Sequence, residues 1–228
     1  MEVTFLASDP AMISHGPRID QMAPRRLDVA VFAMGCFIDA EPRFGAVKGV
    51  WKTTVGFSGG KYPTPTHRDA GDHVEAVMIE YDPIMISYGQ LLEFFLRRSN
   101  NVEGQPPVSQ HDSRIFVKNE FERRLARAAL ERYTLCTDRD CQTRVSICKS
   151  FFEAEQDCQK HFLRSFSYLM EEMALLYPNE ESLIHSTLAT RLNGILGQRY
   201  ASVFSLPEDI EFYDLSESAL HLLKQTAV

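Results

Sequence analysis

Five short apolar segments, interleaved with helical patterns and turn residues, constrain the fold of this chain more than any other feature. The segments are rich in Val, Ile, Ala and Phe, which is typical of strands buried in a sheet. They lie at residues 27–33, 50–57, 73–81, 113–117 and 143–148. Helices are expected at residues 37–44, after the first strand, and at residues 87–98, before the fourth. The order strand-helix-strand-strand-helix-strand predicts an α+β fold, a ferredoxin-like split βαβ sandwich with helices against one sheet.

Apolar residues at helical spacing predict further helices in the second half of the chain. They fall at residues 119–133, 153–173, 181–196 and 215–225, with Asn119 as the N-cap of the first. Together these patterns divide the chain into three parts. Residues 1–26 lack periodicity and are expected to form a flexible or loosely docked N-terminal arm, and residues 27–177 a folded domain. Residues 178–228 are expected to form a helical C-terminal extension, either as its own subdomain or wrapped around the core.

The charge and the composition exclude several classes of partner. The 228-residue chain has a formal net charge of −7, which offers no basic surface to nucleic acid or to an anionic membrane. No apolar run has the length of a membrane span, and the N-terminal residues lack the apolar stretch of a secretion signal. Five cysteines, an odd number without regular spacing, favour reduced thiols over structural disulfides. A cytoplasmic protein is therefore expected.

Cys36 stands where the first predicted strand ends and the first predicted helix begins. The free N–H groups and the dipole of a helix N-terminus stabilise an anion, so a thiolate at this position can have a lowered pKa. Gly35 allows the tight turn that such a junction needs. The alternative reading is a cysteine that only packs in the core, which is the commoner role for a free thiol. Position alone leaves both readings open.

The residues around Cys36 resemble the signature of the methionine sulfoxide reductase A family. The stretch GCFIDAEPRFGAVKGVWKTTVGFSGG at residues 35–60 carries the family's Gly-Cys-Phe and its Val-Gly-aromatic-x-Gly-Gly. Residues 63–66 (PTPT), 71–77 (GDHVEAV) and 151–155 (FFEAE) resemble later family segments. The resemblance covers about residues 27–165 and identifies residues 27–177 as a catalytic domain of this family.

The resemblance implies a thiol-dependent peptide-methionine (S)-S-oxide reductase. The Cys36 thiolate would attack the sulfoxide sulfur, and protonated Glu75 would give a proton to the sulfoxide oxygen. Methionine would leave, and an external reductant such as thioredoxin would reduce the resulting sulfenic acid. Phe37, Ile38, His67 and His111 occupy substrate-binding positions by the same resemblance. No bound metal or other cofactor is expected, and the protein is expected to act as a monomer.

Several residues depart from the family pattern. Ile38 replaces a tryptophan that forms one wall for the substrate methyl group, and His67 and His111 stand where the family has tyrosines. Gln105-Pro106 replaces Asn-Asp, which removes a carboxylate from the site. A histidine can donate the hydrogen bond that a tyrosine would, with a pH dependence of its own. The alternative reading of both histidines is as ordinary loop residues.

The remaining cysteines leave the recycling step open. Cys136, Cys141, Cys148 and Cys158 are candidate resolving thiols, and their spacings do not match the close pairs of structural zinc sites. Two other functions also remain open. The departures could mark a catalytically impaired member that binds methionine-containing peptides or regulates a partner, and Cys36 could instead be a peroxide-sensing thiol.

Overall fold

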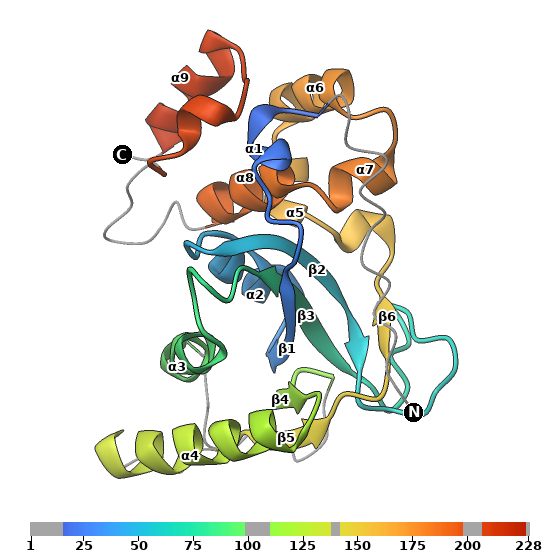
Figure 1. Ribbon diagram of the computed structural model, residues 1–228. Helices are drawn as coiled ribbons and strands as arrows, with labels where there is room; N and C mark the ends of the chain where they lie inside the picture. The colour runs from blue at the N-terminus through green and yellow to red at the C-terminus, as the bar shows by residue number, and fades with distance from the viewer. Residues whose placement is uncertain (1–15, 99–109, 138–141, 198–206, 227–228) are drawn as a thin grey trace.

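In the described part of the chain, six strands form one mixed sheet in the order β5-β4-β1-β3-β2-β6. The computed structural model describes residues 16–98, 110–137, 142–197 and 207–226 (Figure 1). The strands are β1 Asp28–Met34, β2 Val50–Ser58, β3 Val74–Tyr81, β4 Ser113–Val117, β5 Arg144–Ile147 and β6 Phe151–Glu153. Neighbouring strands are antiparallel except β4 and β5, which are parallel. The five expected strands are confirmed to within one or two residues, and so is the α+β class.

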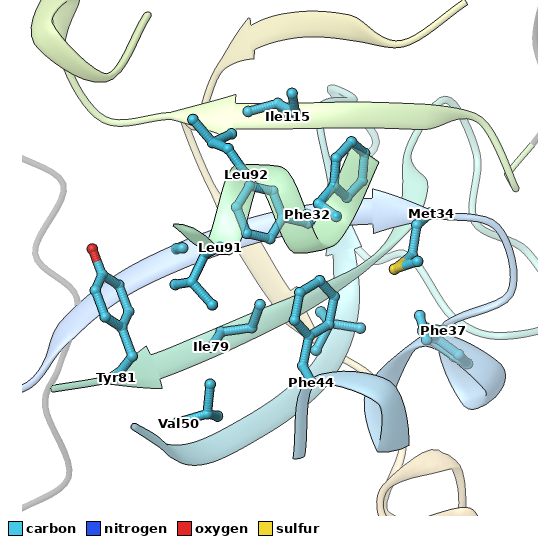
Figure 2. Close-up of a cluster of buried hydrophobic side chains, with 14 of the residues drawn as sticks. Phe32, Met34, Phe37, Phe44, Val50, Ile79, Tyr81, Leu91, Leu92 and Ile115 are labelled. Atoms are coloured by element: carbon cyan, nitrogen blue, oxygen red, sulfur yellow. The ribbon is translucent and has the colours of Figure 1, made fainter. Parts of the chain in front are cut away.

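One face of the sheet is covered by helices α2 Phe37–Gly45, α3 Tyr88–Arg98 and α4 Glu120–Thr137. Strand residues alternate between faces, so Ala30 and Phe32 join the helix-covered core while Val31 packs on the opposite face. Figure 2 shows Phe32 at the centre of this core, and its ring stacks on Phe44 at 5.6 Å between centroids. Both early helices are confirmed, because their apolar stripes face this sheet.

The expected long helix over residues 153–173 is wrong. The chain instead forms β6, a 3-10 turn at Gln156–Cys158, and the helices α5 His161–Arg164 and α6 Ser167–Leu176. Long-range hydrogen bonds outcompete the local helical pattern here. The Gln159 side chain accepts from Val55 N–H at 2.9 Å and donates to Val55 C=O at 2.8 Å, as a neighbouring strand would. Lys160 then takes a left-handed conformation with φ 53°.

The helix expected over residues 181–196 is two helices, α7 Glu180–Ile184 and α8 Thr187–Gly197. Ser186 separates them, since its hydroxyl accepts from Ala189 N–H and donates to Leu183 C=O. The last expected helix is present as α9 Glu217–Thr226. None of the helices in the described ranges combines the length and the apolar character that crossing a bilayer requires.

The described part of the N-terminal segment is docked against these C-terminal helices. Residues 18–21 form the short helix α1 Arg18–Gln21, in which Ile19 is buried. The Asp20 carboxylate accepts from Leu188 N–H at 3.0 Å and from the Tyr177 hydroxyl at 2.6 Å. Of the two alternatives, the described residues of this segment favour docking, because the buried Tyr177 hydroxyl and Leu188 N–H need Asp20 as a partner. Residues 1–15 lie outside the described residues.

Helix α8 packs directly on α2, the helix that follows Cys36 (Figure 1). The two backbones approach at glycines, and a Cβ on Gly194 would lie 2.7 Å from the Ala46 nitrogen. Arg191 donates to the carbonyl oxygens of Gly45 at 3.2 Å and Val47 at 3.1 Å. The C-terminal extension therefore supports the helix of the candidate nucleophile.

A buried ion pair joins α2 to Lys160, the N-cap residue of α5, and a hydrogen bond from α8 reaches the same carboxylate. The Glu41 carboxylate on α2 accepts from Lys160 Nζ at 2.5 Å and from Asn193 Nδ2, on α8, at 3.1 Å. The side chains of Lys160 and Glu41 are 0% and 1% exposed. A buried charge is tolerated only when it is paired and hydrogen-bonded, and this arrangement meets both conditions.

Candidate active site

Cys36 occupies the N-cap position of α2, directly after β1. Gly35 makes the turn with φ 92°, in the left-handed region where a side chain would be strained. A Cβ at Gly35 would meet no atom within 4 Å, so the backbone beside the thiol is open to an approaching molecule. Cys36 itself is half-buried. The junction therefore presents a thiol that is accessible but largely shielded by the core.

Glu75 lies on β3, whose antiparallel pairing with β1 brings it beside the end of that strand. Strand alternation places Glu75 on the same face as Val77 and Ile79, which is the face that the helices cover. The residue is therefore 1% exposed. Its Oε2 accepts a hydrogen bond from the Phe37 N–H at 2.9 Å. This bond attaches the carboxylate to the first turn of the helix that begins at Cys36.

The other oxygen of the Glu75 carboxylate, Oε1, faces the segment before β4. Its Oε1 accepts from Gln110 Nε2 at 3.2 Å and lies 3.1 Å from His111 Nε2. The backbone N–H of Glu75 donates to the Gln110 carbonyl at 2.7 Å. The Cys36 sulfur, a Glu75 oxygen and a His111 nitrogen all lie within 4.8 Å of one another. Three reactive groups from different parts of the sequence thus converge on one point.

Burial raises the pKa of the Cys36 thiol, and the neighbouring Glu75 charge adds to the increase. The backbone N–H groups of Ile38 and Asp39 act in the opposite direction but do not compensate. The pKa of Cys36 is therefore raised and not lowered as a helix N-terminus would predict, because desolvation outweighs the contribution of the helix. The protonated thiol is the stable form near neutral pH.

We expect the alkylation rate of Cys36 by iodoacetamide to rise with pH and to reach its midpoint above about 8.5, the value of a free thiol. Only the thiolate reacts, and a raised pKa delays its formation to higher pH. Mass spectrometry of the Cys36 peptide across a pH series measures this. A free thiol alkylated in the same series serves as reference, and a Cys36 midpoint below about 8.5 would contradict the prediction.

The other predicted substrate-binding residues, Phe37, Ile38 and His67, differ in their burial and in their contacts near this centre. Phe37 is fully buried, and its ring is 5.6 Å from that of Phe57 and 5.7 Å from that of His67. The His67 ring stacks on Phe37 with 17° between planes, and its backbone N–H donates to the Glu155 carboxylate at 3.1 Å. Ile38 is half-buried and packs against the main core. Phe37 thereby links His67 to the helix turn that carries Cys36.

Sequence reasoning missed Gln110. It stands in a polar segment with no periodicity, and its role depends on the pairing of its backbone with β3. The sequence feature that could have pointed to Gln110 is its position next to His111. Gln105-Pro106, the proposed site of the lost carboxylate, lies outside the described residues.

The remaining described cysteines are free thiols. Cys158 is buried in the same core as Cys36, and burial together with the nearby Asp157 raises its pKa to about 12. Cys148 is buried in the cluster on the opposite face, and Cys136 is exposed on α4. Cys141 lies outside the described residues. A thiol with so high a pKa as that of Cys158 is a poor attacking group at neutral pH.

Comparison with known proteins identifies the family. The family described as peptide methionine sulfoxide reductase matches residues 28–189. Peptide methionine sulfoxide reductase A5 of Arabidopsis thaliana is 40% identical over 175 residues, which are 75% of this chain and 68% of the relative. A peptide methionine sulfoxide reductase of Drosophila melanogaster is 36% identical over 168 residues, covering 73% and 67% of the two chains.

A solved structure carries the same fold. The crystal structure of Mxr1 from Saccharomyces cerevisiae in reduced form has a TM-score of 0.54 and 20% identity, covering 64% of this chain and 88% of that one. At this identity the likeness concerns the fold alone, whereas the family match covers most of the present chain. The chain belongs to the peptide methionine sulfoxide reductase family of enzymes.

Proposed function

We propose that this protein reduces the S epimer of methionine sulfoxide, free or in proteins, with Cys36 as nucleophile and Glu75 as proton donor. The observation that carries the proposal is the convergence of the Cys36 sulfur with the buried carboxylate of Glu75, within 4.8 Å. Membership of the family supplies the class of reaction. The buried Glu75 side chain supplies the proton donor that this reaction needs beside the thiol.

The chemistry follows from these two groups. The Cys36 sulfur forms a bond to the sulfur atom of the sulfoxide, while Glu75 donates a proton to the sulfoxide oxygen. The hydroxyl so formed passes to the Cys36 sulfur while the S–O bond of the substrate and the new S–S bond break. The substrate sulfur gains two electrons and leaves as the thioether of methionine, and Cys36 is oxidised to a sulfenic acid. A thiol with a raised pKa requires a base to remove its proton, and the adjacent Glu75–His111 pair is within reach to accept it. The same proton can then be delivered to the sulfoxide oxygen.

The surrounding residues have positioning roles in this proposal. The Phe37 N–H and the Gln110 amide hold the two carboxylate oxygens of Glu75 in a fixed orientation. His111, with a side chain 43% exposed, stands at the solvent side and can donate to the sulfoxide oxygen. Ile38 and His67 supply the apolar and aromatic contacts that a methyl thioether favours, and Phe37, which is fully buried, supports the His67 ring by stacking on it.

An external thiol completes the cycle. A thiolate attacks the sulfenic acid to release water and form a disulfide, and a second thiol then regenerates Cys36. Cys158 is a poor internal candidate, since it is buried and has a pKa of about 12. We propose a dithiol reductant of the thioredoxin type, without a bound cofactor, acting on a monomer in a reducing compartment such as the cytosol.

We further assign the catalytic domain to residues 27–177, the extension to residues 178–228, and the core to the ferredoxin-like class. The four strands β4-β1-β3-β2 with their two intervening helices support the class assignment. The parallel strand β5 and the edge strand β6 are additions to this core.

The decisive experiment measures reduction of dabsylated methionine S-sulfoxide, with dithiothreitol as reductant, by the wild type and by Cys36→Ser. We expect turnover by the wild type and none by the variant, because a hydroxyl cannot replace the thiolate in this oxidation. Cys136→Ser is the matched control, since its thiol lies on the exposed surface of α4. Absence of turnover in a folded wild-type protein, with both dithiothreitol and thioredoxin, would overturn the proposal. Peptide binding without turnover would then favour a binding or regulatory protein.

A further inference from the structure

We infer that Cys36, Glu75 and His111 also form a binding site for a single Zn²⁺ ion. Among the described residues, these three bring a sulfur, a carboxylate oxygen and an imidazole nitrogen to within 4.8 Å of one another. Metal binding at this point does not require that the protein reduce a sulfoxide. The consequence for activity, reversible blocking of Cys36, rests on the proposed function.

The distances fit a small tetrahedral ion. Zinc binds sulfur, imidazole nitrogen and carboxylate oxygen at about 2.0–2.3 Å, so its ligand atoms lie roughly 3–4 Å apart. Glu75 Oε1 and His111 Nε2 already lie 3.1 Å apart. Only the thiol has to move inward, and Cys36 is half-buried at a turn whose Gly35 leaves open space beside it. The ion would bridge Glu75 Oε1 and His111 Nε2 in place of their direct contact.

The donor set selects the metal. Zn²⁺ is borderline in softness and accepts thiolate, imidazole and carboxylate together, whereas Mg²⁺ and Ca²⁺ require oxygen ligands. Three protein ligands with an open fourth position is the usual arrangement of an accessible zinc site, and the 43% exposure of the His111 side chain provides that opening.

The neighbouring hydrogen bonds hold the ligands in orientation. Glu75 Oε2 is fixed by the Phe37 N–H, which leaves Oε1 directed toward His111 and the ion. The Gln110 amide donates to the same carboxylate. Partners of this kind orient metal ligands and raise affinity, and they are already in place.

Binding releases the Cys36 proton to solvent, and the thiolate sulfur then bonds to the ion. The affinity for Zn²⁺ should consequently rise with pH. Coordination to the ion lowers the nucleophilicity of the thiolate and occupies the Glu75 oxygen beside it, so attack on a sulfoxide should slow. Removal of the ion by a chelator restores the free thiol.

The test uses the full-length, reduced protein and Co²⁺ as a spectroscopic substitute, in the absence of any sulfoxide. We expect a thiolate-to-cobalt charge-transfer band that saturates at one equivalent and disappears when Zn²⁺ is added. The band should be absent in Cys36→Ser. His111→Gln keeps a polar side chain of similar reach but loses the imidazole ligand, and should weaken Zn²⁺ binding by about 100-fold or more.

Matched controls separate this site from other thiols and histidines. Cys136→Ser and His221→Gln alter exposed residues and should leave the band and the Zn²⁺ affinity unchanged. A band that persists in Cys36→Ser, or wild-type Zn²⁺ affinity in a folded His111→Gln protein, would overturn the inference. Because the readout is spectroscopic, failure of reductase activity would leave this result intact.

Discussion

Replacing Glu75 by glutamine should leave a folded protein whose turnover of methionine S-sulfoxide falls by about 100- to 10,000-fold, the usual contribution of a positioned general acid. Glutamine has the shape of glutamate, and its carbonyl oxygen can still accept from the Phe37 N–H. It cannot deliver a proton to the sulfoxide oxygen. Steady-state kinetics should therefore show the loss in kcat rather than in KM.

The matched control is Glu80→Gln, on the same strand β3 but half-buried and remote from Cys36. Its turnover should equal that of the wild type. Circular dichroism and the alkylation of Cys36 check that each variant keeps its fold and its thiol. Wild-type kcat in Glu75→Gln would show that the proton comes from another group, with His111 as the nearest candidate.

Replacing Lys160 by methionine should lower the free energy of unfolding by about 3–5 kcal/mol, the cost of removing one partner of a buried ion pair. Methionine matches the aliphatic stem of lysine but leaves the Glu41 carboxylate with an uncompensated charge in the core. Urea denaturation followed by circular dichroism measures the shift. Since Glu41 lies on the helix of Cys36, partial loss of activity at ambient temperature should accompany the loss of stability.

Two variants test whether the uncompensated Glu41 charge in the core causes the loss of stability. Lys48→Met removes the same side chain from a surface pair with Glu208, where both groups are mostly exposed, and should have no measurable effect. The double variant Glu41→Gln with Lys160→Met removes both charges and should recover part of the lost stability. If Lys160→Met were as stable as the wild type, the pair would be shown not to stabilise the packing of α2 against the start of α5.

The C-terminal extension contacts α2, the helix that begins after Cys36. Helix α8 contacts α2 through the close backbone approach at Gly194, through Arg191 and through the Asn193 bond to Glu41. None of these residues lies at the Cys36 sulfur. The extension therefore acts on the site by holding the helix that presents the thiol.

Much of the sheet could be predicted from the sequence because the strands β1 to β4 are largely buried and rich in apolar residues, a signal that is local. The same holds for α2 and α3, whose apolar stripes have helical spacing, and for the Asn119 cap, which accepts from Glu122 N–H at 2.9 Å. The helix expected over residues 153–173 failed for the opposite reason. Its residues have helical spacing, but Gln159 bonds to the backbone of β2 across the fold.

The sequence by itself predicted the strands β1 to β5, the helices α2 and α3, and the family, because these depend on local apolar patterns and on motifs of neighbouring residues. The resemblance to the family also singled out Cys36 and Glu75 for the proposed chemistry. Only the tertiary structure decided that His111 and Gln110 meet Glu75, that the described part of the N-terminal segment docks on the extension, and that the pKa of Cys36 is raised. Each of these results depends on desolvation and on hydrogen bonds between residues far apart in sequence. Such contributions are set by the neighbours that folding provides, which no local pattern records.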